Sequence, residues 1–128
     1  MARRALALKV EQVNEAGGIN GRPIQLVVED EKSQPAEAVA AVNKLTNQNK
    51  VDALVAFTTS GSGQAAMPVI ERWGIPWVGG VPAAVFSTPP KKWVFQHVPT
   101  NDQFIVRTMQ SLERRHTTTF AMLNDIGA

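Results

Sequence analysis

The sequence predicts an α/β fold, with an open, mostly parallel sheet and helices on both faces. Short apolar runs alternate along the chain with longer segments whose apolar residues recur with helical period. Glycine, proline and asparagine separate these segments at the spacings of strand–helix–strand units. A hydrophobic fraction of 44% in 128 residues allows one buried core, so the chain is one domain or a piece of a larger one.

The first part of the chain is predicted to hold a helix and then a strand. Apolar residues recur at Leu6, Val10 and Val13, which predicts an amphipathic helix over residues 2–16. The glycine pair that follows ends this helix, because a left-handed cap costs least at glycine. A turn leads to IQLVVE, a predicted strand over residues 24–29.

A second helix opens at Ser33 or Gln34 and ends by residue 49. Pro35 falls in its first turn, and Glu37 lies near its positive end. Its inner face carries apolar residues at helical spacing, namely Val39, Val42 and Leu45.

The central strand is predicted over residues 51–57, and a helix over residues 60–73 follows it. Pro68 lies inside that helix, so either a kink or a short first segment is expected. The short apolar segment 75–80 predicts a further strand, and a proline-rich loop covers residues 81–90.

The last part of the chain predicts a strand over residues 93–97, a helix capped by Thr100 or Asn101, and a strand over residues 118–123. The inner face of the helix comprises Phe104, Ile105, Thr108, Met109 and Leu112. Because the pattern starts inside a helix and stops just after a strand, both ends look cut. The alternative is a domain that begins with a helix.

The polar turn between the central strand and the next helix is the predicted binding element. In an open parallel sheet, small ligands bind where the carboxyl end of a strand leads into a helix. Free backbone N–H groups and the helix dipole favour an anion there. The hydroxyls of Thr58, Thr59 and Ser60 add hydrogen-bonding groups, and Gly61 lets a ligand approach the backbone.

No motif supports catalysis, a cofactor or a metal. The segment 61–66 fits the loose dinucleotide pattern GxGxxG/A, but residues 79–84 contain no acidic residue for a ribose. Phosphate-loop and serine-hydrolase motifs are missing from the sequence. His97 could face the ligand edge, although a structural role is the favoured interpretation, and Asp30 and Glu31 are expected to be solvated. The sequence therefore predicts a protein that is not an enzyme.

Composition further restricts the kinds of protein that this chain could be. The net charge of +2 and the scattered basic pairs argue against nucleic-acid binding, and the sequence has no cysteine for disulfides or thiolate sites. No apolar run reaches the ~20 residues of a membrane helix. Residues 1–10 lack the uninterrupted apolar stretch of a signal peptide, so no export signal is expected in this chain.

The runs NEAGGINGRPIQLVVEDEKSQPAEAVAAVNKL and VDALVAFTTSGSGQAAMPVIERWGIPWV resemble branched-chain amino-acid-type solute-binding proteins of ABC importers. The resemblance extends over residues 5–124, and its most specific blocks are residues 16–21 and 59–62. It implies a type I periplasmic-binding-protein fold, in which two lobes close on a ligand about a hinge.

By this resemblance, residues 1–128 are a partial N-terminal ligand-binding lobe, with residues 118–128 leading toward the second lobe. The first strand of the family's sheet, which normally lies between segments 24–29 and 51–57, is missing. The chain by itself is therefore expected to be marginally stable, to self-associate or to change its strand order. The full-length parent would be periplasmic or extracellular, with ABC transporter membrane subunits as partners.

The resemblance also implies roles for particular residues. Ser60 matches the position that holds the ligand carboxylate, and Val81 matches the one whose carbonyl accepts from the ligand ammonium. Ala83 replaces a threonine and Asn101 replaces an aspartate of amino-acid-binding members, so an aliphatic or aromatic carboxylate or an amide is also allowed. The predicted ligand-binding residues are Thr58, Thr59, Ser60, Gly61, Val81, Pro82, Ala83 and Asn101.

The function expected from the sequence is binding of a small amino-acid-like or carboxylate solute for ABC-type import, as half of a two-lobed cleft. The alternative is a ligand-sensing module of a receptor or regulator. A nucleotide-dependent enzyme is the weakest of the three hypotheses.

Overall fold

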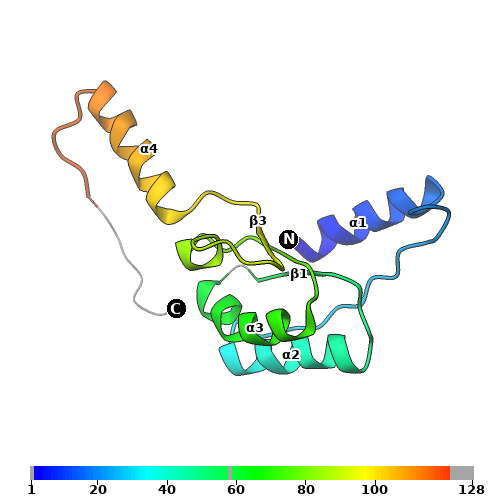
Figure 1. Cartoon of the computed structure of the whole chain (residues 1–128). Coiled ribbons are helices and arrows are strands. Elements are labelled where there is room, and N and C mark those ends of the chain that lie inside the picture. The colour runs from blue at the N-terminus through cyan, green and yellow to red at the C-terminus, as the bar shows by residue number, and fades with distance from the viewer. Residues whose placement is uncertain (1, 58, 122–128) are drawn as a thin grey trace.

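The computed structural model describes residues 2–57 and 59–121 (Figure 1). In chain order the elements are α1 (Ala2–Glu15), α2 (Pro35–Asn47), β1 (Leu54–Ala56), α3 (Ser60–Trp73), β2 (Trp77–Gly79), the 3₁₀ helix η1 (Ala84–Phe86), β3 (Val94–Gln96) and α4 (Asn101–Arg114). The predicted helices therefore form with nearly their predicted bounds, and α3 continues through Pro68.

The helix ends follow from local sequence. Gly74 ends α3 in the left-handed conformation, with φ of 66°, and its N–H donates to the carbonyl oxygen of Ile70 at 3.0 Å. Thr100, not Asn101, caps α4. The Thr100 hydroxyl accepts from the Gln103 N–H at 3.3 Å, and the Gln103 side chain accepts from the Thr100 N–H at 3.0 Å.

The three strands form one parallel sheet in the order β1-β2-β3. Leu54 pairs with Trp77, and Trp77 pairs with Val94, so the three strands run in register. Each strand is shorter than its predicted range. The α/β class and the parallel sheet are thus confirmed.

The core lies between the sheet and the pair α2 and α3, which lie side by side (Figure 1). Trp77 is fully buried, and its ring centroid lies 5.4 Å from that of Phe57 and 5.4 Å from that of Phe86, edge to face in both cases. Its indole N–H donates to the carbonyl oxygen of Ala56 at 3.0 Å. The other buried apolar residues are Ala38, Val42, Leu54, Ala66, Ile70, Val81 and Val94.

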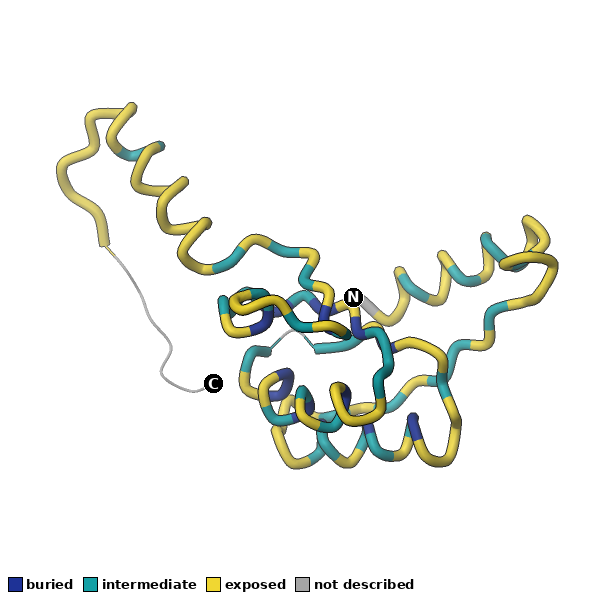
Figure 2. The backbone as a smooth tube through the Cα atoms, viewed as in Figure 1, coloured by how far each residue is buried: buried dark blue, intermediate teal, exposed yellow. Residues whose placement is uncertain are grey.

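The opposite face of the sheet is open, which differs from the expectation of helices on both faces. Val55, Val78 and Phe95 lie in register across the three strands and are 61%, 38% and 53% exposed. Both α1 and α4 extend away from the sheet and are mostly exposed (Figures 1 and 2). The predicted inner face of α4 is therefore uncovered.

The strand predicted over residues 24–29 does not form, which corrects the sequence-based expectation. In the described part of the chain no strand lies beside this segment, and an extended segment without a hydrogen-bonded neighbour is not a strand. An isolated antiparallel bridge joins Ile19 to Arg22 before it. Of the strand predicted over residues 118–123, residues 118–121 lack regular secondary structure, and the remainder lies outside the described residues.

Candidate functional site

The carboxyl ends of the three parallel strands meet at one edge of the sheet, where the sequence places the binding residues. At Gly80, just after β2, a Cβ atom would lie 3.3 Å from Nε2 of His97 and 3.8 Å from the carbonyl oxygen of Phe57. Phe57 directly follows β1, and His97 directly follows β3. The ends of neighbouring strands are therefore in contact around Gly80. His97, which the sequence favoured as structural, has an exposed side chain at this edge.

The turn between β1 and α3 presents the start of a helix at this edge. Thr59 is the N-cap, and the first intrahelical bond runs from the Gly63 N–H to the Thr59 carbonyl oxygen at 3.2 Å. The N–H groups of Ser60 and Gly61 precede that bond and have no acceptor within the helix. Ser60 is half-buried and Gly61 is exposed, so these donors stand at the rim of the sheet. Thr58 lies outside the described residues.

Thr59 contributes an unusual hydroxyl. Its side chain makes no capping hydrogen bond, and its Oγ1 is buried without a hydrogen-bond partner among the described residues. A buried hydroxyl without a partner costs about 1–3 kcal/mol. Among the described residues, the α3 N-terminus thus combines backbone donors that have no intrahelical acceptor with a hydroxyl that has no hydrogen-bond partner.

The loop after β2 is tied to β3 and α4. The carbonyl oxygen of Val81 accepts from Nε2 of Gln96 at 2.6 Å, and that of Pro82 accepts from the N–H of Asn101 at 2.9 Å. The Val81 carbonyl, predicted to accept from a ligand ammonium, therefore already has one donor from the protein. Val81 is also fully buried, so its carbonyl oxygen is not open to a ligand in this conformation.

The remaining predicted residues flank these bonds. Ala83 is half-buried at the start of η1, and Asn101 is exposed as the first residue of α4. The strand order is β1-β2-β3. Ser60 and Gly61 follow the outer strand β1, and Asn101 follows the other outer strand, β3. The segment Val81–Ala83 follows the middle strand and therefore lies between them. The structure thus brings those predicted residues that it describes to one edge of the sheet.

Glu31 was predicted to be solvated, and the structure differs. Its side chain is half-buried, and its Oε2 accepts a hydrogen bond of 2.7 Å from Oγ of Ser62, which is 1% exposed, in the first turn of α3. The sequence gives only a weak indication of this contact, because an acidic residue that follows an extended segment usually lies at the surface.

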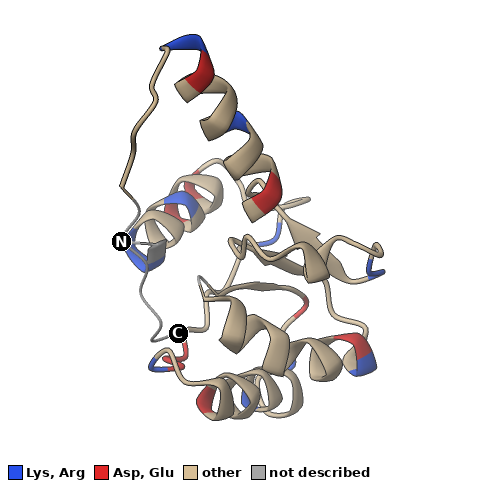
Figure 3. Ribbon diagram, turned by 90° about the vertical axis from the view of Figure 1, so that its left-hand side faces the viewer, with Lys and Arg blue, Asp and Glu red and all other residues tan. Residues whose placement is uncertain are grey.

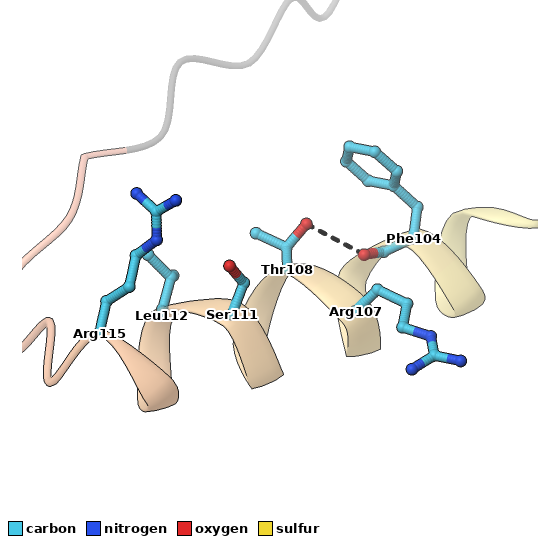
Figure 4. A pocket seen from close by; sticks show the side chains of 6 residues that line it. All are labelled: Phe104, Arg107, Thr108, Ser111, Leu112 and Arg115. Carbon is cyan, nitrogen blue, oxygen red and sulfur yellow. Dashed lines mark hydrogen bonds between the residues drawn. The ribbon is translucent and has the colours of Figure 1, made fainter.

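Other candidate sites are weaker. A hollow along α4 is lined by residues of that helix and its C-cap (Figure 4), so no second element converges on it. Figure 3 shows both basic and acidic residues on α1 and α4. Within residues 2–57 and 59–121, no group of three or more histidine, aspartate or glutamate side chains could hold a metal ion. No helix in those ranges is both long and apolar enough for a membrane span.

The sequence and fold match known proteins over most of the chain. Residues 1–127 match the family described as periplasmic binding protein. An amino acid binding protein of Pseudomonas aeruginosa is 40% identical over 72 residues, which are 56% of this chain and 19% of that protein. The leucine-, isoleucine-, valine-, threonine- and alanine-binding protein of the same organism is 36% identical over 75 residues, 59% of this chain and 20% of that protein.

A solved structure shows the same fold. The branched-chain amino acid transporter substrate binding protein LivJ from Streptococcus pneumoniae, in complex with isoleucine, superposes with a TM-score of 0.70 at 32% identity, covering 73% of this chain and 27% of that one. The matched part thus spans between about a fifth and a quarter of these relatives. The resemblance found in the sequence is confirmed, and the chain belongs to the periplasmic binding protein family, with relatives of the branched-chain amino-acid type.

Proposed function

We propose that this chain is a non-catalytic part of a solute-binding lobe, which holds a small amino-acid-like or carboxylate compound at the carboxyl edge of its sheet. The observation that carries the proposal is the start of α3 at that edge, with the Ser60 and Gly61 N–H groups free of intrahelical acceptors. Backbone donors and the positive end of a helix dipole favour a carboxylate.

The ligand class is supported by the relatives. The relative from Pseudomonas aeruginosa is named for the amino acids that it binds, and the LivJ structure is a complex with isoleucine. In this chain, Ser60 would hold the carboxylate together with the adjacent N–H groups. An ammonium would reach the Val81 carbonyl only after a movement that exposes it, because that residue is fully buried and its carbonyl already accepts from Gln96. The whole protein would deliver its solute to an ABC transporter from the periplasm or the outside of the cell.

One lobe supplies only part of the binding energy. A helix end contributes about 0.3–1 kcal/mol to a nearby charge, and a charge-assisted hydrogen bond contributes about 1.5–3 kcal/mol. Two such bonds together contribute about 3–6 kcal/mol, and the translational and rotational freedom lost on association reduces this to a dissociation constant of about 1 mM or weaker. The 128-residue chain should therefore bind weakly, and micromolar affinity would contradict a half-site.

Amide chemical shifts in ¹⁵N-labelled protein test the proposal at millimolar ligand. Leucine, 4-methylpentanoate (leucine without its ammonium) and 3-methylbutylamine (without the carboxylate) separate the two charged groups. We expect the first two compounds to shift the amides of Ser60 and Gly61 and the amine to leave them unchanged. Shifts scattered over the surface, or none with either carboxylate, would contradict the proposal.

Substitution of Ser60 provides the matched test. Ser60→Ala should weaken carboxylate binding by about tenfold or more, since it removes one hydrogen bond to a charged group. Ser111→Ala, the same change on the distant helix α4, should leave the affinity unchanged. Equal affinities of the Ser60→Ala variant and the unsubstituted chain would remove Ser60 as the anchor.

A further inference from the structure

We propose that Glu31 is a positioning residue, which fixes the first turn of α3 and so the backbone donors at Ser60 and Gly61. The inference deepens the proposed function, because those donors are the proposed carboxylate site. It begins from the hydrogen bond between Oγ of Ser62 and Oε2 of Glu31, at 2.7 Å, which joins residues 31 positions apart in the sequence.

Helix α3 lacks the local groups that usually fix a helix start. Its N-cap side chain makes no hydrogen bond to the helix, and its first turn contains no acidic residue. Helix α4, in contrast, begins with a complete capping box at Thr100 and Asp102 in its first turn. Carboxylates stabilise a helix N-terminus through its partial positive charge. Glu31 supplies to the first turn of α3, from another segment, a hydrogen-bond acceptor that the helix does not provide there itself.

The segment that carries Glu31 is itself held in place. The Gln34 N–H donates to the Glu31 carbonyl oxygen at 2.8 Å, across a turn in which Lys32 and Ser33 have φ of 51° and 55°. Beside this turn, Pro35 lies against the start of α3, where a Cβ at Gly61 would be 4.0 Å from its Cγ. The turn therefore contacts the first turn of α3 through the Glu31 carboxylate, and Pro35, the first residue of α2, lies near Gly61.

The burial of Ser62 gives this bond its effect. The residue is 1% exposed, so a hydroxyl deprived of Glu31 would stay buried without that partner. The backbone would then relax at Ser62, which adjoins Gly61 and lies two residues from Ser60. Because a carboxylate ligand needs both N–H groups aligned, a small displacement of this turn weakens binding.

The experiment uses the exchange rate of the Gly63 amide, because its bond to the Thr59 carbonyl oxygen, at 3.2 Å, closes the first turn of α3. Ser62→Ala and Glu31→Ala should each raise that rate by about threefold or more. Glu31→Gln should restore it, since the amide oxygen still accepts from the Ser62 hydroxyl. The double alanine variant should be no faster than the single variants, because both remove the same bond.

Glu29→Ala is the control, since that carboxylate pairs with Lys44 at 2.9 Å and not with α3. It should leave the Gly63 exchange rate unchanged. An unchanged rate in Ser62→Ala, an additive effect in the double variant, or no rescue by Glu31→Gln would each overturn the positioning role. Far-UV circular dichroism verifies that each variant is folded. If an alanine variant unfolds, the Gly63 exchange rate of Glu31→Gln is compared with that of the unsubstituted chain.

The ligand measurement separates this inference from the proposed function. In Ser62→Ala and Glu31→Ala, binding of 4-methylpentanoate should weaken by about threefold or more, and in Glu31→Gln it should be at least as tight as in the unsubstituted chain, because a like charge near the carboxylate is gone. If 4-methylpentanoate does not bind the unsubstituted chain, the proposed function fails. The Gly63 exchange rates decide the role of Glu31 without any ligand.

Discussion

Gly63 shows how a single residue sets the distance between α3 and the core. A Cβ at this position would lie 3.1 Å from Cζ of Phe86 and 3.2 Å from Cη2 of Trp77. Both rings are fully buried and pack edge to face against each other, so neither can move away freely. The absence of a side chain at Gly63 lets the helix lie close to Trp77.

Two glycine-to-alanine substitutions in α3 should therefore have different effects on the free energy of unfolding. Gly63→Ala should lower the free energy of unfolding by about 1–3 kcal/mol, because overpacking outweighs the gain in helix propensity. Gly61→Ala should change it little or raise it by up to about 1 kcal/mol, since its Cβ would meet only Pro35 Cγ, at 4.0 Å. Urea denaturation of both variants measures the difference. Equal effects at the two positions would contradict the packing described for Gly63.

At the element scale, α3 and α4 contrast although both span 14 residues. In α3, Ala66 and Ile70 are buried in the core, and Ser62 lies at the same helical spacing. In α4, the apolar residues Phe104, Ile105 and Met109 are 67%, 57% and 48% exposed. The stability of an amphipathic helix comes mainly from packing of its apolar face, so α4 depends on its caps.

The same substitution in the two helices tests this contrast. Ile70→Ala should lower the free energy of unfolding by about 2–5 kcal/mol, because it leaves a cavity in the core. Ile105→Ala should change it by less than about 0.5 kcal/mol, because that side chain is already exposed. Thermal or urea unfolding followed by tryptophan fluorescence reports both values. A large loss of stability from Ile105→Ala would show that a surface covers α4 in solution.

At the scale of the whole molecule, the sheet has unpaired strand edges and an exposed apolar face. In the described part of the chain β1 and β3 each pair only with β2, which leaves both edges of the sheet open. Val55, Val78 and Phe95 form an exposed apolar row on one face. Parallel sheets in α/β proteins are normally covered on both faces, and open edges favour pairing with other chains.

The chain by itself should therefore have a free energy of unfolding below about 5 kcal/mol or self-associate. Sedimentation velocity at rising concentrations measures association, and equilibrium denaturation measures stability. Val55→Lys should reduce association with little effect on folding, since the residue is 61% exposed on the edge strand. A cooperative, concentration-independent transition of a monomer with ordinary stability would contradict this prediction.

The sequence by itself determined the kinds and order of the four helices and the three strands that form, and the place of the turn before α3. The periodicity of α2 and α3, the glycine after α3, the threonine before α4 and the apolar run of β1 act through neighbours within about four residues, so they are visible in the pattern. The α/β class, the parallel sheet and the position of Ser60 at its carboxyl edge follow from that order.

Only the tertiary structure decided which strands pair, which helix faces pack against other elements and which distant side chains form hydrogen bonds. Within residues 2–57 and 59–121, segment 24–29 has the composition of a strand but no strand paired with it, and the apolar residues of α4 are exposed. The bond from Gln96 to the Val81 carbonyl and the bond from Ser62 to Glu31 join residues 15 and 31 positions apart. Local sequence patterns do not encode such pairs, because their formation depends on how the whole chain folds.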